Sequence, residues 1–283
     1  MKIFFIICLI LIIILLIVNI ADINRFIQVD YKIGTDKIDK EIKVVFLSDM
    51  HNKEFGKENR RLFAAIRNIN PDIICCGGDM LTAHPGVDTM PPVRLLSKLK
   101  DYPIYYGIGN HEYRMKIYRD DYGNTYDEYV EKLKGMGVKV LENERAVIEA
   151  LNISIQGLMI DKSYYKRFEK KEMTSEYVRE LTGHKGKEYE IMLAHNPEYF
   201  KAYEESGADL VLSGHIHGGI VRLPFVGGVI SPRLRLFPKF DGGLFVKNNT
   251  TMVLSRGIGS HTLPIRIFNP GELIVITLLP CKN

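Results

Sequence analysis

The stretch Lys43-Val-Val-Phe-Leu-Ser-Asp-Met-His51 sets the architecture, because a short apolar run ends there in a loop that carries Asp49 and His51. The same theme returns further along the chain. The later examples are Asp72-Ile-Ile-Cys-Cys-Gly-Gly-Asp79, Pro103-Ile-Tyr-Tyr-Gly-Ile-Gly-Asn110-His111-Glu112, Glu190-Ile-Met-Leu-Ala-His195-Asn-Pro197 and Asp209-Leu-Val-Leu-Ser-Gly-His215-Ile-His217-Gly-Gly219. Apolar runs of this length that end in turn residues are typical of buried strands.

Apolar residues at helical spacing lie between several of these runs. They predict helices over 57–69, 92–100, 125–134 and 197–206. Strands that alternate with helices indicate an α/β fold whose sheet is at least partly parallel. Further strand pairs are predicted among 138–141, 146–150 and 153–156, with a hairpin at 243–246 and 251–255 and a last strand at 273–279. Together these elements predict two packed sheets with helices outside.

The N-terminus is an almost unbroken apolar run from Ile3 to Ile20. As a helix, at about 1.5 Å per residue, it reaches roughly 27 Å, close to the hydrocarbon thickness of a bilayer. The alternative, a cleaved signal peptide, favours a shorter apolar core and an A-x-A-like site. We therefore predict an uncleaved transmembrane anchor at 1–21, a linker at 22–41 and one domain at 42–283. We expect that domain to be extracytoplasmic, although the basic residues flanking the run nearly balance.

The composition is that of an ordinary globular protein, with 46% hydrophobic and 25% charged residues. A net charge of +4 is too mild to argue for nucleic acid as a partner. The four cysteines form no disulfide or zinc pattern, so we expect plain thiols. Cys75 and Cys76 are adjacent in a strand and should point to opposite faces.

The polar loops follow the carboxyl ends of the predicted strands, where open α/β sheets bind their ligands. We predict that seven residues hold metal. They are Asp49, His51, Asp79, Asn110, His195, His215 and His217. Imidazole and carboxylate together suit Mn, Fe or Zn, and seven ligands are too many for one ion. They suit two ions about 3.5–4 Å apart, bridged by a carboxylate, which would supply a hydroxide and neutralise a phosphoryl group.

The order and spacing of Asp49-x-His51, Gly78-Asp79, Gly109-Asn110-His111-Glu112, His195 and Gly214-His215-x-His217 resemble the calcineurin-like metallophosphoesterases. The segments 255–259 and 264–270 look like the membrane-anchored bacterial phosphohydrolase branch of that family. The resemblance implies a four-layer α-β-β-α sandwich of two mixed sheets. It also implies one metal at Asp49, His51 and His217, a second at Asn110, His195 and His215, and Asp79 between them.

His111 should stand beside the metals as the catalytic general acid or as a donor to a phosphate oxygen. The sequence does not identify a carboxylate that would orient it. Asp79 is followed by Met-Leu-Thr rather than the Arg-Gly of the protein phosphatases, which argues against a phosphoprotein substrate.

We therefore expect a binuclear hydrolase acting on phosphodiester or pyrophosphate bonds. The substrate would be a phosphorylated small molecule or a lipid-linked envelope compound, of which UDP-2,3-diacylglucosamine is one version. Two alternatives remain open. One is a non-catalytic metal-bearing scaffold that binds phospholipid, and the other is a nuclease, although the charge pattern does not favour nucleic acid.

Several further residues keep two interpretations. His84 and His261 either line the cleft or have no role there, whereas His184 is expected at the surface. The basic stretch Arg222–Lys239 either contacts an anionic headgroup or substrate phosphate, or forms a solvated loop. The tyrosines between Tyr102 and Tyr129 are expected to pack in the core rather than stack on a substrate.

Overall fold

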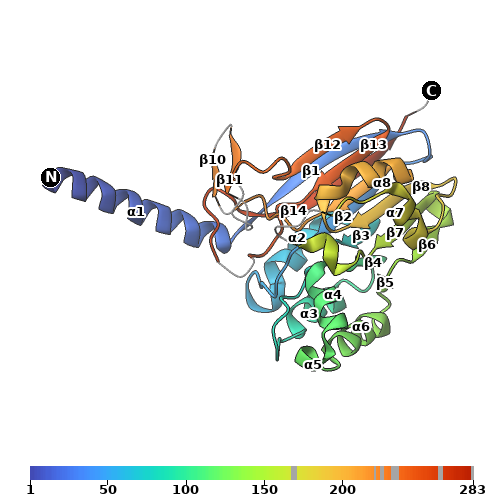
Figure 1. Ribbon diagram of the computed structural model, residues 1–283, viewed down its shortest axis with the longest axis horizontal. Coiled ribbons are helices and arrows are strands. Elements are labelled where there is room, and N and C mark those ends of the chain that lie inside the picture. The colour runs from blue at the N-terminus through green and yellow to red at the C-terminus, as the bar shows by residue number, and fades with distance from the viewer. Residues whose placement is uncertain (167–170, 220, 224–225, 231–235, 261–263, 282–283) are drawn as a thin grey trace.

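The computed structural model describes residues 1–166, 171–219, 221–223, 226–230, 236–260 and 264–281. Within this part of the chain, two six-stranded mixed sheets pack face to face and helices cover their outer faces (Figure 1). The predicted four-layer α-β-β-α sandwich is confirmed. One apolar helix, α1 (Lys2–Ile23), projects from the domain and is long and apolar enough to cross a membrane.

The first sheet has the strand order β1-β14-β2-β3-β4-β5. In that order its strands are Phe26–Thr35, Gly271–Pro280, Ile42–Leu47, Ile73–Cys76, Ile104–Gly107 and Lys139–Leu141. The second sheet has the order β12-β13-β9-β8-β7-β6. Its strands are Gly243–Lys247, Thr250–Leu254, Leu210–Ser213, Tyr189–Ala194, Ile153–Leu158 and Arg145–Ile148. A separate hairpin pairs β10 (Val221–Leu223) with β11 (Gly227–Ile230).

The helices fall into two groups, one against each sheet. Those against the first sheet are α2 (Arg60–Ile69), α3 (Met90–Lys98), α4 (Asn110–Ile117), α5 (Arg119–Tyr122) and α6 (Thr125–Gly135). Those against the second sheet are α7 (Ser175–Thr182) and α8 (Phe200–Ser206). Short 3-10 turns lie at Lys57–Asn59, Glu149–Leu151, Lys162–Tyr165 and Pro197–Tyr199. All four predicted helices are therefore present, with shifted ends.

The central strands are apolar on both faces because each face meets a different core. Val44 and Phe46 of β2 pack between the sheets, whereas Val45 and Leu47 pack under the helices of the first sheet. Cys75 and Cys76 likewise lie in the two different cores as buried free thiols. Strands buried on both faces lose the polar alternation of a half-exposed strand, which explains the continuous apolar runs.

Two sequence predictions about the strands are wrong. The predicted linker 22–41 contains β1, which pairs in parallel with β14 along its whole length. Its period-two alternation, with Val29 and Tyr31 half-buried and Asp30 and Lys32 exposed, is the signal of an edge strand. The second error concerns 138–141, which does not pair with 146–150. Instead β5 pairs with β4, and the chain then crosses to the other sheet, where β6 pairs with β7.

Candidate metal centre

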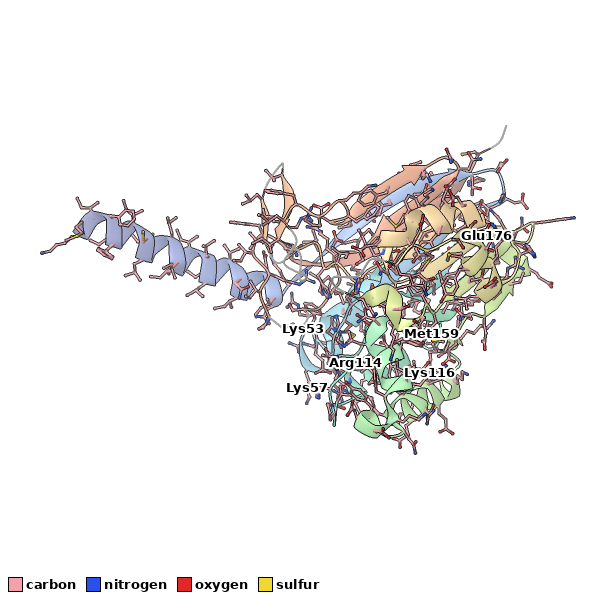
Figure 2. The ribbon with its side chains drawn as sticks, viewed as in Figure 1. Lys53, Lys57, Arg114, Lys116, Met159 and Glu176 are labelled. Atoms are coloured by element: carbon pink, nitrogen blue, oxygen red, sulfur yellow. The ribbon has the colours of Figure 1, made fainter. Side chains whose placement is uncertain are left out.

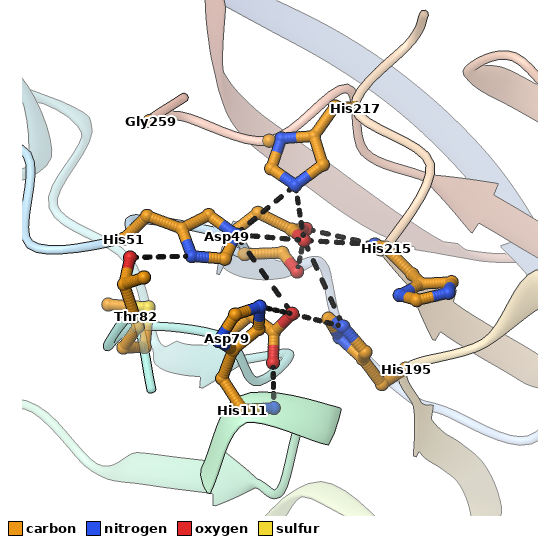
Figure 3. Close-up of polar contacts among 12 residues, drawn as sticks. Asp49, His51, Asp79, Thr82, His111, His195, His215, His217 and Gly259 are labelled. Carbon is orange, nitrogen blue, oxygen red and sulfur yellow. Dashed lines mark hydrogen bonds and ion pairs between the residues drawn. The ribbon is translucent and has the colours of Figure 1, made fainter. Parts of the chain in front are cut away.

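The seven predicted ligands gather at one edge of the sandwich. Asp49, Asp79 and Asn110 follow β2, β3 and β4 of the first sheet, and His195 and His215 follow β8 and β9 of the second. Because these strands run parallel within each sheet, their carboxyl ends meet at a common edge. Figure 3 shows the imidazole and carboxylate groups converging there from both sheets.

Asp49 lies at one side of the cluster. His217 Nε2 is 3.3 Å from Asp49 Oδ1, and His51 Nε2 is 3.2 Å from His217 Nε2. His51 Nε2 is 3.9 Å from the same Asp49 oxygen. Ligand atoms of these three residues all lie within 4.8 Å of one another, close enough to surround a single ion.

Asp79 lies between this group and a second one. Its Oδ2 atom is 3.0 Å from His195 Nε2 and 4.0 Å from both His51 Nε2 and His111 Nε2. Asp79, His195 and His215 form another set of ligand atoms within 4.8 Å. The carboxylate of Asp79 therefore faces both halves of the cluster.

Two buried carboxylates lie among several imidazoles, and the pKa values of both kinds of group are shifted as a result. Burial, together with the charge of Asp79, raises the pKa of Asp49 to about 6 despite the opposing effect of His195. Burial also acts to raise the pKa of Asp79, but His195 and His111 hold it well below its usual range. For His195, burial acts to lower the pKa, and Asp79 and Asp49 overcome that effect and raise it to about 10. The site therefore concentrates charges that need compensation.

The side-chain oxygen of Asn110 indicates that the site fits a metal. Its Oδ1 atom is buried and accepts no hydrogen bond from the residues that the structure describes. A buried amide oxygen without a donor is costly unless a cation or water satisfies it. Amide oxygen, carboxylate and imidazole are a donor set that suits Mn, Fe or Zn. The residues present thus fit a metal centre.

Neighbouring groups orient the imidazoles. His195 Nδ1 donates to the Gly77 carbonyl oxygen at 2.7 Å, which leaves Nε2 directed toward Asp79. His51 Nδ1 lies 3.1 Å from the Thr82 hydroxyl. His111 Nδ1 accepts the backbone N–H of Ala83 at 2.8 Å, so the neutral ring carries its proton on Nε2, the atom nearer Asp79. These contacts set which nitrogen of each ring faces the site.

Glu112 is the residue whose role the sequence missed. Its buried carboxylate accepts 2.8 Å hydrogen bonds from the backbone amides of Asp79 and Met80 and a 2.7 Å bond from the Tyr106 hydroxyl. It binds the Asp79 loop and does not contact His111 through any of these bonds. Its place in the Gly109–Glu112 block was the available signal.

Two glycines allow the backbone to approach the carboxylates. A Cβ atom on Gly109 would lie 2.2 Å from Oδ1 of Asp79, and one on Gly214 would lie 2.1 Å from Oδ2 of Asp49. Both distances are far below van der Waals contact. Only a residue without a side chain therefore lets the backbone come this close to the two carboxylates.

A cavity of about 1030 Å³ opens beside the cluster. It is lined by three residues of the cluster, His51, Asn110 and His111, and also by His84 and Arg114. Of the two interpretations of His84, the structure supports the one in which it lines the cleft, and His184 is exposed as expected. His261 lies outside the described residues, as do Arg233 and Arg235 of the basic stretch. Most tyrosines between 102 and 129 are buried, as predicted.

Comparison with known proteins gives consistent matches. Residues 42–219 match the family model described as calcineurin-like phosphoesterase. An uncharacterized metallophosphoesterase of Aquifex aeolicus is 30% identical over 89% of this chain and 92% of its own. One from Helicobacter pylori strain J99 is 28% identical over 88% of this chain, which spans 62% of that protein. A zebrafish protein named transmembrane protein with metallophosphoesterase domain is 26% identical over 88% of this chain and 56% of its own.

The family match and the His/Asp cluster together support a metal-dependent phosphoesterase, a hydrolase of phosphoester bonds. The chain belongs to the calcineurin-like phosphoesterase family.

Proposed function

We propose that the protein is a binuclear enzyme that hydrolyses phosphodiester or pyrophosphate bonds. The observation that carries this proposal is the position of Asp79 between the Asp49, His51, His217 group and the His195, His215 group. One ion would be held by Asp49, His51 and His217, and the other by Asn110, His195 and His215. Asp79 would contact both ions. Mn, Fe and Zn all suit these donors. When bound, such a pair supplies a hydroxide nucleophile and offsets the charge of the phosphoryl group.

His111 would act on the substrate rather than on a metal. Its Nε2 lies 4.0 Å from Asp79 Oδ2 and the residue lines the cavity, while its Nδ1 accepts the backbone N–H of Ala83. In this tautomer the ring donates a hydrogen bond from Nε2, which suits an oxygen of the phosphoryl or leaving group. Arg114, on the cavity wall, offers a further cation to an anionic substrate.

The membrane anchor is part of the proposal. Two polar residues near the end of α1 are bound into the domain, because Asp22 accepts the Asn269 amide at 2.9 Å and Asn19 accepts the Arg266 amide at 2.7 Å. Cleavage after α1 would remove both acceptors, which supports an uncleaved helix. We propose an extracytoplasmic domain and a lipid-linked or envelope substrate such as UDP-2,3-diacylglucosamine. Labelling of the exposed Cys281 in intact cells with an impermeant maleimide tests the membrane side.

The test of hydrolysis uses the full chain, stripped of metal and reloaded with Mn²⁺. We expect turnover of bis-p-nitrophenyl phosphate to exceed that of p-nitrophenyl phosphate. Asp79→Ala should abolish it, and His111→Ala should lower kcat by roughly 10²–10⁴-fold, the usual contribution of a positioned proton donor. His184→Ala removes an exposed histidine and serves as the matched control.

The result that would overturn the proposal is the absence of turnover with any of Mn²⁺, Fe²⁺ or Zn²⁺ although two ions are bound per chain. A preference for the monoester would correct the bond type while leaving the metal centre intact.

A further inference from the structure

An apolar surface adjoins the domain end of α1. It consists of exposed side chains on the β10–β11 hairpin and the two loops next to it, which we call the juxtamembrane surface. Its members are Leu223, Val226, Leu236, Phe237, Ile265 and Phe268. Phe237 is 63% and Leu236 67% exposed, far more than large apolar side chains in a monomer core. Clustered exposed apolar groups mark contact with a partner or a membrane.

Hydrogen bonds join this surface to α1. Asn19 donates to the Pro264 carbonyl at 3.3 Å and accepts the Arg266 amide at 2.7 Å, so the loop that carries Ile265 and Phe268 is bound to the helix. The Arg222 amide of the hairpin donates to the Ile267 carbonyl at 3.0 Å. Figure 1 shows β10 and β11 beside the end of α1, on the side of the domain from which the helix leaves.

The same loop is bound to the metal centre. The Arg266 guanidinium is buried and donates to the carbonyl oxygens of Gly257 and Gly259. The Gly259 amide in turn donates to the Asp49 carbonyl at 2.8 Å. Ser260, next in the chain, lines the cavity. The juxtamembrane surface, α1 and the mouth of the cleft are therefore parts of one bonded unit.

Basic side chains lie on the other side of the helix end. Lys53 and Arg61 donate to the side-chain and backbone oxygens of Asn24, the first residue after α1. Lys57 and Arg60 are exposed next to them. Figure 2 shows Lys53 and Lys57 at the part of the domain that lies below α1. Basic residues close to the end of a membrane helix favour anionic lipid headgroups.

We infer that the juxtamembrane surface docks onto the bilayer that α1 spans, as a second membrane contact that holds the cleft at the lipid–water boundary. Two observations favour the bilayer as the partner of this surface. The surface is hydrogen-bonded to the membrane helix itself, and basic residues lie on the opposite side of that helix. Apolar groups at such a boundary insert into the headgroup region. The inference rests on the proposed anchor and is independent of the proposed hydrolysis.

The experiment exploits the absence of tryptophan from the chain. Full-length Phe237→Trp and Phe268→Trp variants are placed in nanodiscs of phosphatidylcholine and phosphatidylglycerol, with and without brominated acyl chains. Val147→Trp is the matched control, because Val147 is 40% exposed on β6, which lies on the side of the domain away from α1 (Figure 1), and Phe268 is 45% exposed. Leu223→Trp is a further position should either phenylalanine variant fail to fold, as judged by thermal unfolding.

We expect the bromolipid to quench the Phe237→Trp and Phe268→Trp variants at least about twofold more than the Val147→Trp variant, since interfacial groups sit roughly 5–10 Å deep. Equal quenching of all three variants would overturn the inference. The inference would also be overturned if the emission of the Phe237→Trp or Phe268→Trp variant showed a buried tryptophan that the bromolipid does not quench. A protein partner or a second copy of the chain would then cover the surface. Hydrolysis of bis-p-nitrophenyl phosphate by the same nanodiscs is scored separately, so failure of docking and failure of the enzyme proposal are distinguishable.

Discussion

The carboxylate of Glu112 accepts the backbone N–H of Asp79 at 2.8 Å, so the residue after the candidate catalytic histidine holds the central carboxylate of the metal cluster. Asp79 has a positive φ of 51°, a backbone conformation that needs support in a residue other than glycine. Glu112 supplies this support from α4, and it also accepts the next amide along, that of Met80. The loop after β3 is thus positioned by the element that follows β4.

Glu112→Gln should destabilise the protein and weaken metal binding. One oxygen would be replaced by an NH₂ group that cannot accept a backbone N–H, and a buried unsatisfied donor costs about 1–3 kcal/mol. Urea unfolding of the metal-free protein measures this cost. Glu58→Gln removes the charge of an exposed glutamate bonded to Lys98 and should change the unfolding free energy little. Equal effects of the two substitutions would contradict the role of Glu112.

Gly259→Ala should disturb the loop of Asp49. A Cβ atom there would lie 1.9 Å from the Met50 carbonyl oxygen and 3.1 Å from that of Asp49, and both are backbone atoms. Overpacking of this kind costs about 1–3 kcal/mol, and a shift of about 1 Å in the site would lower kcat by roughly 10²-fold. Thermal unfolding and steady-state kinetics measure the two effects.

The control for Gly259→Ala is Gly135→Ala at the end of α6. Among the residues that the structure describes, an added Cβ there meets no atom within 4 Å. It should leave kcat unchanged and the stability equal or slightly higher, by at most about 0.4–1 kcal/mol. A Gly259→Ala enzyme as active and as stable as the Gly135→Ala enzyme would show that the loop does not position Asp49.

Removal of metal should lower the thermal midpoint. The buried Asp49 and Asp79 carboxylates share one site, and bound cations would offset their charges. A ligand at about 100 times its Kd stabilises by about 2.7 kcal/mol, and about 2–4 °C per kcal/mol is typical of a chain of this size. We therefore expect a fall of roughly 5–10 °C on chelation, measured by differential scanning calorimetry. Asp79→Ala should not respond to the chelator, and a chelator-insensitive parent would contradict the metal centre.

Metal binding should release a proton from His195. Burial opposes its charge, but Asp79 and Asp49 raise its pKa to about 10, so the metal-free imidazole is protonated at about pH 8. A ligating imidazole must be neutral. The number of protons released should therefore be near its full value at about pH 8 and should fall as pH rises through about 10. Titration calorimetry in buffers of different ionisation enthalpy measures it.

His195→Ala should lower this release by about one proton per chain, whereas His184→Ala should leave it unchanged. A release that does not depend on His195 would show that this residue is already neutral in the metal-free protein.

Most of the site could be predicted because its residues stand next to local sequence signals. Asp49 and His51, or His215 and His217, stand directly after apolar runs, and the carboxyl ends of parallel strands necessarily meet at one edge. Glu112 lies in the Gly109–Glu112 block, but the backbone amides that its carboxylate accepts lie 31 to 33 residues away in the chain, and pairing over that separation is set by packing. The same holds for Asn19 and Arg266, which are separated by 247 residues.

The α/β class, the apolar N-terminal helix and the identity of the residues at the strand ends could all be predicted from the chain alone, because burial on both faces and strand-end chemistry are local properties. The folded structure was needed to show that β1 joins the first sheet beside β14, that β5 and β6 belong to different sheets, and that Glu112 and Gly259 support the two carboxylates. Those outcomes depend on backbone hydrogen bonds and close approaches between distant segments, which no local pattern of side chains encodes.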